Sequence, residues 1–117
     1  MIRKTFALLG LLAIALSGCY YDIEEELYPA PCFIPEEVNY DIHIEPIIQA
    51  NCATSGCHSA GGNGPGDYTS FAGLLPFVED GSFENRVIEL RNMPPNGELA
   101  PCEIQLINAW LQAGFPE

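Results

Sequence analysis

The sequence has little positive charge. Its 117 residues contain four lysine and arginine residues against sixteen aspartate and glutamate residues, a formal charge of −12. Two of the four cations, Arg3 and Lys4, lie at the N-terminus, so the remaining chain has two arginines against all sixteen acids, a formal charge of −14. Such a surface repels nucleic acids and anionic lipid headgroups, and we therefore expect no nucleic-acid partner.

Long hydrophobic runs are also missing. The apolar stretch from Phe6 to Leu16 is too short to span a bilayer, and it follows two cations as in a secretory signal. Residues 16–19, Leu-Ser-Gly-Cys, end it and look like the site at which bacterial lipoproteins are acylated and cleaved. We expect residues 1–18 to be a lipoprotein signal peptide and Cys19 the lipid-bearing first residue. The alternative is an ordinary signal peptide with a coincidental cysteine.

The segment after Cys19 is acidic and then proline-bearing, with no sustained helical period. It predicts a tether over residues 19–40, and either a solvated linker or the export signal of surface lipoproteins would have this composition. The expected location is the bacterial cell envelope, with a lipid anchor in the outer membrane, on the periplasmic or the surface face. Residues 41–117 remain as a single domain. A domain this small usually needs a disulfide, a metal or a cofactor to be stable.

Strand alternation, internal repeats and nucleotide-binding glycine motifs are absent, and the pattern predicts an all-α fold of short helices. The first should cover residues 42–50, with Asp41 as N-cap and Pro46 in its first turn. The second should cover 70–78, capped by Thr69 or Ser70 and interrupted at Pro76. The third should cover 83–91, capped by Ser82, with Phe83, Val87, Ile88 and Leu90 as its apolar set. An irregular loop is expected at 59–66, and the last helix should run from Pro101 to a C-terminal cap at Gly114.

Two cysteines and a histidine lie close together near the middle of the chain: Cys52, Cys57 and His58. In a Cys-x-x-Cys-His run, each thiol adds across a vinyl group of the porphyrin and the histidine binds the iron, which is how c-type haem is attached. The spacer here has four residues, but Cys57 and His58 are adjacent, as this chemistry requires, and the small residues 53–56 can loop outward. We therefore expect one covalent haem c per chain.

Met93 lies in a polar, proline-rich turn, residues 91–97, that cannot form an apolar face to bury it. A thioether is a soft donor to iron, and the two prolines that follow stiffen the loop. Met93 is therefore expected to be a metal ligand beside His58. The alternative is that Met93 only fills a gap at the surface.

Along the chain, the expected segments follow in the order helix, cysteine–histidine run, irregular loop, methionine turn and last helix. With this order, the sequence resembles class I cytochromes c, and more closely the small single-haem domains of bacterial lipoproteins. The resemblance rests on residues 45–52, 56–58, 93–95 and 109–114. It implies an all-α, cytochrome c-like fold of short helices around one covalently bound haem, with the N- and C-terminal helices crossing beside it. It also implies that His58 and Met93 bind the iron from opposite faces. The four-residue spacer departs from the commonest pattern and leaves open whether both cysteines are alkylated.

Cys32 and Cys102 remain once the other three cysteines are assigned, and an even pair in an exported protein suggests a disulfide. Such a bridge would join the two ends of the domain and contribute about 4 kcal/mol in the chain-entropy model. Without haem, the four cysteines allow three connectivities, including a Cys52–Cys57 bridge.

Three other interpretations compete with the haem. The first is a disulfide-stabilised, cofactor-free lipoprotein that acts as a binding module. The second is a zinc site of Cys52, Cys57 and His58, which would want a fourth ligand. The third is a haem peroxidase, for which the sequence offers no distal histidine. His43 is a rival axial ligand, although nothing around it resembles a ligand loop.

The expected function is electron transfer without enzymatic activity. The chain would be a membrane-anchored monohaem cytochrome that carries single electrons to or from a redox partner in the cell envelope. Because the chain is strongly acidic, we expect that partner to have a basic docking face.

Overall fold

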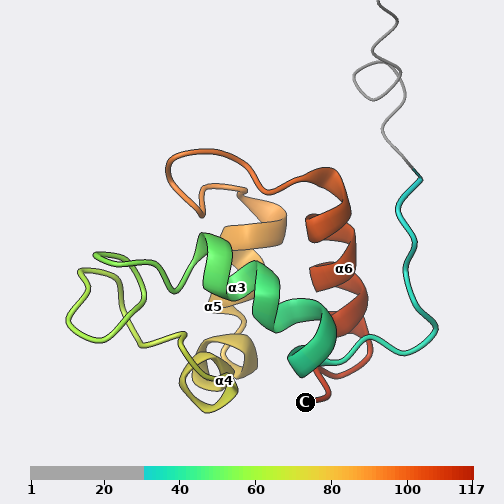
Figure 1. The fold of residues 1–117 in the computed structure, drawn as a ribbon, viewed down its shortest axis with the longest axis horizontal. Coiled ribbons are helices and arrows are strands. Elements are labelled where there is room, and N and C mark those ends of the chain that lie inside the picture. The colour runs from blue at the N-terminus through green and yellow to red at the C-terminus, as the bar shows by residue number, and fades with distance from the viewer. Residues whose placement is uncertain (1–30) are drawn as a thin grey trace, which may run out of the picture. The chain divides into compact units, whose positions relative to one another are not determined.

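The first helix begins two residues earlier than the sequence suggests. In the computed structural model, which describes residues 31–117, a π-helical turn η1 (Tyr40–Ile44) continues into α3 (Glu45–Asn51) (Figure 1). The N-cap is Asn39, whose side-chain oxygen accepts a hydrogen bond from the backbone N–H of Ile42 at 3.3 Å. The prediction of Asp41 as N-cap was therefore wrong. Tyr40 is buried in the core as the first residue of η1, so the cap lies at the residue before it.

The second helix, α4 (Phe71–Glu79), begins after Ser70, whose hydroxyl accepts from the N–H of Gly73 at 3.2 Å. This confirms one of the two predicted caps. The helix continues through Pro76, which was expected to interrupt it. Pro76 lies on the exposed side of α4, where water can solvate the carbonyl that loses its partner, so the helix tolerates it.

The third helical segment consists of α5 (Ser82–Glu84) and the π-helical turn η2 (Asn85–Glu89). The N-cap position is Gly81, with φ of 77°, while Asp80 accepts from the backbone N–H of Ser82 at 2.8 Å. The prediction of Ser82 as cap was wrong by one residue. Leu90 was wrongly assigned to the apolar face, since it lies beyond η2 and is 56% exposed.

The last helix, α6 (Pro101–Gln112), agrees with the prediction at both ends. A carboxylate oxygen of Glu103 accepts from the N–H of Ala100 at 2.9 Å, and Pro101 occupies the first helical position. At the other end, Gly114 has φ of 84° and donates to the carbonyl of Leu111 at 3.1 Å. Residues 31–117 therefore form helices and loops with no strand, and the fold is all-α.

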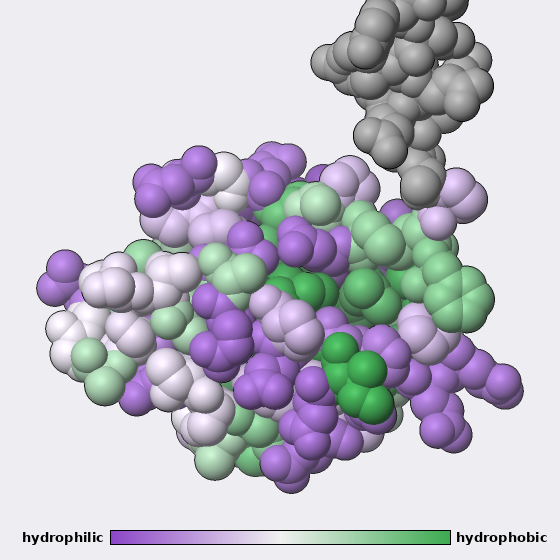
Figure 2. Space-filling view, viewed as in Figure 1, coloured by the Kyte–Doolittle hydropathy of each residue, from purple (hydrophilic) through white to green (hydrophobic). Residues whose placement is uncertain are grey.

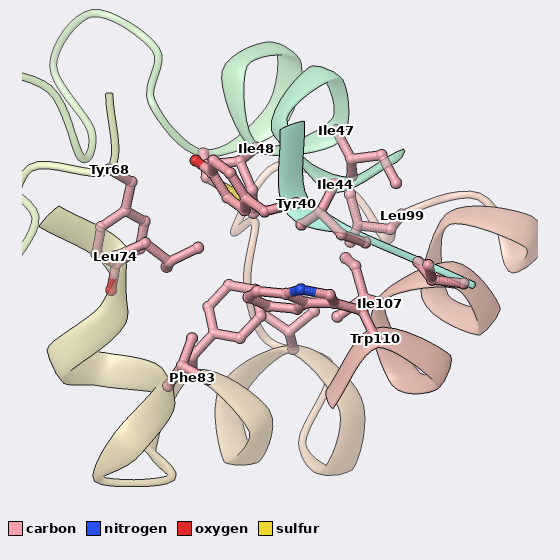
Figure 3. Close-up of a cluster of buried hydrophobic side chains, with 14 residues drawn as sticks. Tyr40, Ile44, Ile47, Ile48, Tyr68, Leu74, Phe83, Leu99, Ile107 and Trp110 are labelled. Carbon is pink, nitrogen blue, oxygen red and sulfur yellow. The ribbon is translucent and has the colours of Figure 1, made fainter. Parts of the chain in front are cut away.

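The core lies where the first and last helices meet (Figure 3). The indole of Trp110 is fully buried and packs at a centroid distance of 5.9 Å from the ring of Tyr40. The carbonyl of Pro116 joins the two helices, because it accepts from both Tyr40 N and Trp110 Nε1 at 2.9 Å. The largest fully buried side chains come mainly from these two helices: Trp110, Tyr40, Ile44, Ile48, Leu74 and Ile107.

Cys32 and Cys102 form the predicted disulfide, with Cα atoms 5.2 Å apart. The compact unit begins at Cys32, whereas the sequence placed the start of the domain at residue 41. The extra residues belong to the unit because this disulfide ties them to α6 and because Val38 is buried in the core.

The predicted signal peptide, the lipidation site Cys19 and nearly all of the proposed tether before Cys32 lie outside the described residues. Within residues 31–117, none of the helices has the length and apolarity needed to cross a bilayer. Figure 2 shows mainly hydrophilic side chains on this face, with hydrophobic surface over the segment that precedes η1, where Phe33 is exposed.

Candidate functional site

The site is built outward from the C-terminal end of α3. Cys52 follows the last residue of this helix, and its N–H donates to the carbonyl of Ile48 at 2.8 Å. Because the helix ends inside the core, the Cys52 side chain is only 8% exposed. The apolar face of α3 therefore places this thiol beside the interior of the domain.

The four-residue spacer forms a closed turn. The N–H of His58 donates to the carbonyl of Cys52 at 3.1 Å, and the N–H of Cys57 donates to that of Thr54 at 3.0 Å. Ser55 and Gly56 are exposed at the outside of this turn, and Gly56 has φ of 83°. The extra residues are thus accommodated outward, while Cys52 and His58 remain linked through the backbone.

Two polar contacts tie the loop after His58 to the residues before it. The N–H of Gly64 donates to the carbonyl of Cys57 at 3.1 Å, and the N–H of Tyr68 donates to that of His58 at 2.8 Å. A Cβ atom at position 64 would lie 2.8 Å from Nδ1 of His58. Glycine is therefore needed at position 64 for the loop to pass this close to the imidazole.

The His58 ring is oriented by its surroundings. Nδ1 lies 2.7 Å from the carbonyl oxygen of Pro65. Since a carbonyl can only accept, Nδ1 is the donor in this contact, and in the neutral imidazole the free lone pair is then on Nε2. The ring also stacks on Tyr68, with centroids 4.1 Å apart and 3° between the planes. This is the state of an imidazole that can bind a metal through Nε2.

Met93 lies in the segment between η2 and α6. Its side chain is partly buried and packs against the core. Asn92 donates its backbone N–H to the carbonyl of Arg86 at 3.1 Å. Its side-chain amide, oriented with the oxygen toward the guanidinium, accepts from Arg86 Nη1 at 3.1 Å. These contacts tie the start of the methionine loop to η2.

A single cavity of about 840 Å³ brings the predicted site residues together. Cys52, Cys57 and His58 line it, and so does the loop that contains Met93. The volume lies within the range of pockets that bind cofactors and drug-sized ligands. Aromatic and aliphatic side chains from the rest of the domain complete its walls: Tyr68, Phe77, Phe83 and Val87.

Charged groups are few along this cavity. Asp80, Arg86 and Glu98 line it together with His58. Arg86 and Arg91 are the only arginine or lysine side chains in residues 31–117, and Arg86 alone of the two lines the cavity. The Asp80 carboxylate accepts from the side chain and backbone of Ser82, which lowers its pKa.

The two cysteines of the site are free thiols. Burial raises the pKa of Cys52 to about 11, with smaller contributions from Cys57 and Glu103. Cys52 is therefore a protonated thiol at neutral pH and a weak thiolate nucleophile. Residues 31–117 contain no group of three or more histidine, cysteine, aspartate or glutamate side chains that could hold a metal ion. A site with one histidine and one methionine as metal ligands does not belong to this class of group, because methionine is not among these residue types.

The imidazole of His43, the rival axial ligand, makes its hydrogen bond outside the cavity. Its Nδ1 accepts a hydrogen bond from the backbone N–H of Asn39 at 3.2 Å, at the start of η1. It does not line the cavity, whereas His58 does.

Sequence reasoning missed three residues of the site: Pro65, Tyr68 and Arg86. Pro65 stands between two glycines, a pattern that predicts a turn but does not reveal which donor its carbonyl would accept from. Tyr68 and Arg86 carried no local signal beyond residue type. Comparisons of the chain with protein-family models, with curated proteins and with solved structures found no match.

Proposed function

We propose that this protein is a monohaem c-type cytochrome that carries single electrons in the bacterial cell envelope. One observation carries the proposal: two free thiols, an imidazole with its Nε2 free and a thioether, from segments 35 or more residues apart, line one cavity. Their chemistry fits haem c, since thiols form the thioether links while histidine and methionine are soft enough to bind haem iron.

Each of these residues has a defined role in this proposal. Cys57 and Cys52 would hold the group through thioethers, in each of which the thiol sulfur bonds to one vinyl carbon and the thiol proton goes to the other. His58 and Met93 would be the axial ligands. Haem c supplies reversible one-electron exchange, and a histidine–methionine pair gives it a higher reduction potential than two histidines.

A class I cytochrome c-like fold is part of the proposal. It is supported by the packing of the first helix against the last, which the resemblance implies. It is also supported by the chain order of helix, cysteine–histidine run, glycine-rich loop, methionine loop and terminal helix.

The alternatives receive less support. A cofactor-free binding module with a Cys52–Cys57 bridge disagrees with the free state of both thiols. A zinc site of Cys52, Cys57 and His58 would want a fourth ligand, and residues 31–117 hold no group of three or more histidine, cysteine, aspartate or glutamate side chains that could bind a metal ion. A peroxidase needs an open coordination position, and Met93 lines the cavity that would hold it.

Acylation of Cys19 would anchor the domain to the membrane, and residues 19–31 would act as the tether. With a formal charge of −14 on the chain after residue 18, the proposed redox partner has a basic docking face. Electron transfer to a basic cytochrome should then slow as salt is added, because salt screens the attraction between the two proteins. Equal rates with basic and acidic partners at all salt concentrations would contradict this steering.

The haem proposal is tested by expression in a host that attaches c-type haem, followed by intact mass and visible spectroscopy. We expect a mass increased by one haem that survives acid–acetone extraction, and a sharp visible band on reduction. Cys57→Ala should reduce attachment more than Cys52→Ala, because Cys57 also positions His58. A protein that loses all haem to the solvent would exclude covalent attachment.

Ligation is tested separately, with His43 as the matched control. Met93→Ala should lower the reduction potential and admit small ligands such as imidazole to the iron, whereas His43→Ala should change neither. If Met93→Ala leaves the oxidised spectrum and the potential unchanged, another residue is the ligand.

A further inference from the structure

Two contacts hold the imidazole of His58, and they restrict different motions. The hydrogen bond from Nδ1 to the carbonyl of Pro65 fixes the direction in which the ring points, but it still allows the ring to turn about that bond. The phenol ring of Tyr68 lies flat against the imidazole, with 3° between the two planes. Turning the imidazole would break this face-to-face contact, so Tyr68 restricts the remaining motion.

Tyr68 can restrict His58 because it is itself fixed. Its side chain is only 6% exposed, and its backbone N–H donates to the carbonyl of His58. The ring of Phe77 from α4 lies 5.2 Å from it and that of Phe83 from α5 lies 6.5 Å away. Figure 3 shows Tyr68 and Phe83 in the same buried cluster. The stacked ring is thus part of the packed interior and not a surface side chain.

We propose that Tyr68 is a positioning residue that sets the plane of the axial His58 imidazole and favours the oxidised form of the site. This inference rests on the proposed function. The orientation of an axial imidazole governs the splitting of the iron orbitals, which the low-spin ferric EPR spectrum reports. The face of an aromatic ring is electron-rich, so it interacts better with the imidazole when the metal is more positively charged.

The test compares three variants of the haem-loaded protein. Tyr68→Leu keeps an apolar side chain but removes the stacked ring, and we expect shifted and broadened ferric EPR g values together with a higher reduction potential. Tyr68→Phe keeps the ring, so both properties should return to near those of the wild type. Phe71→Leu is the matched control, because Phe71 packs on Tyr40 and Trp110 and does not line the cavity. It should lower stability and leave the EPR spectrum unchanged.

A second measurement needs no variant. In the reduced, diamagnetic wild type, ring protons of His58 and Tyr68 should give nuclear Overhauser cross-peaks and large ring-current shifts. Missing cross-peaks, or a Tyr68→Leu protein with wild-type EPR and potential, would overturn the positioning role. A Tyr68→Phe protein that behaves like Tyr68→Leu would also overturn it, because the hydroxyl and not the ring would then matter. A wild type without covalent haem would instead refute the proposed function itself.

Discussion

The first and last helices bury their apolar side chains against each other, whereas the cavity is bounded to a large extent by loops. Ile44 and Ile48 on one side and Ile107 and Trp110 on the other are fully buried. By contrast, no residue in the loops 53–67 and 91–98 falls in the buried class. The two regions are therefore stabilised differently. Hydrophobic burial stabilises the first and last helices, which together are called the helical region below. Backbone hydrogen bonds stabilise the loops 53–67 and 91–98, which are called the cavity loops.

This difference explains how one short chain can combine a stable fold with a large cavity. Three of the backbone hydrogen bonds that shape the loop after Cys52 are donated by the N–H groups of His58, Gly64 and Tyr68. Each joins two residues no more than ten positions apart, so the backbone of the loop contributes directly to its shape. Substitutions in the helical region should therefore act on stability, and those in the cavity loops should act mainly on the site.

The largest effect is expected at the centre of the helical region. Trp110→Ala should lower the free energy of unfolding by about 3–5 kcal/mol, because it removes a fully buried indole and leaves the carbonyl of Pro116 with one donor fewer. Met93→Ala, from the cavity loops, is the comparison and should cost less than half as much, since Met93 is only partly buried. Trp110 is the only tryptophan, so the Trp110→Ala variant has no tryptophan fluorescence. Urea unfolding of both variants is therefore followed by circular dichroism. Equal losses would contradict the division into two regions.

The disulfide should have the next largest effect. Replacing Cys32 and Cys102 together with serine opens a link across 70 residues of sequence and should lower the free energy of unfolding by about 4 kcal/mol in the chain-entropy model. Cys57→Ser, in the cavity loops, removes a free thiol and should cost much less. Reducing agent should destabilise the wild type and leave the double variant unaffected. A reduced wild type as stable as the oxidised one would show that the bridge adds nothing.

The fold could be predicted from the sequence wherever the signals are local. α6 has proline at its start, glycine after its end and apolar residues on one side, and all three signals agree. The start of η1 could not be predicted because two good capping residues, Asn39 and Asp41, stand close together. The choice between them depends on Tyr40, whose N–H pairs with Pro116 at the far end of the chain.

The site shows the same limit. Residue type and order singled out Cys52, Cys57, His58 and Met93, and these four do line one cavity. The walls could not be predicted, because the stacking of Tyr68 on His58 depends on how a glycine-rich loop folds back on itself. Neither periodicity nor capping describes such a loop.

A smaller effect is expected from the glycine that lets the loop pass His58. Gly64→Ala would place a Cβ atom 2.8 Å from Nδ1 of His58, so either the ring or the loop must move. Overpacking of this kind costs about 1–3 kcal/mol. Asn63→Ala, at the exposed neighbouring position, is the matched control and should be nearly neutral. Urea unfolding and the NMR shifts of the His58 imidazole measure the two consequences. Unchanged NMR shifts of the His58 imidazole in Gly64→Ala would show that the position of the loop does not affect the imidazole.

The smallest effect concerns the pH dependence of the protein without attached haem. Burial raises the pKa of the Cys52 thiol from its ordinary value of 9.0 to about 11. Because the folded state favours the protonated thiol, its contribution is fully present below pH 9 and is lost as the pH rises toward 11. At pH 10 the loss should be about 1 kcal/mol, since one pH unit of differential titration corresponds to about 1.4 kcal/mol.

The control is Cys52→Ala, which removes this titration. Tyr40 and Tyr68, whose pKa values burial raises to about 12, also destabilise the fold when they ionise, but only above their ordinary value of 10.0. The informative range is therefore pH 8 to 10. Across that range, urea unfolding should show a steeper decline of the free energy of unfolding with pH in the wild type than in Cys52→Ala, although the variant is less stable at every pH.

Parallel curves of the free energy of unfolding against pH would mean that Cys52 titrates like an exposed thiol, and iodoacetamide should then alkylate it as fast as it alkylates Cys57. We expect instead that Cys57 is alkylated first, because it lies in the partly exposed turn of the cavity loops, whereas Cys52 is buried at the end of α3.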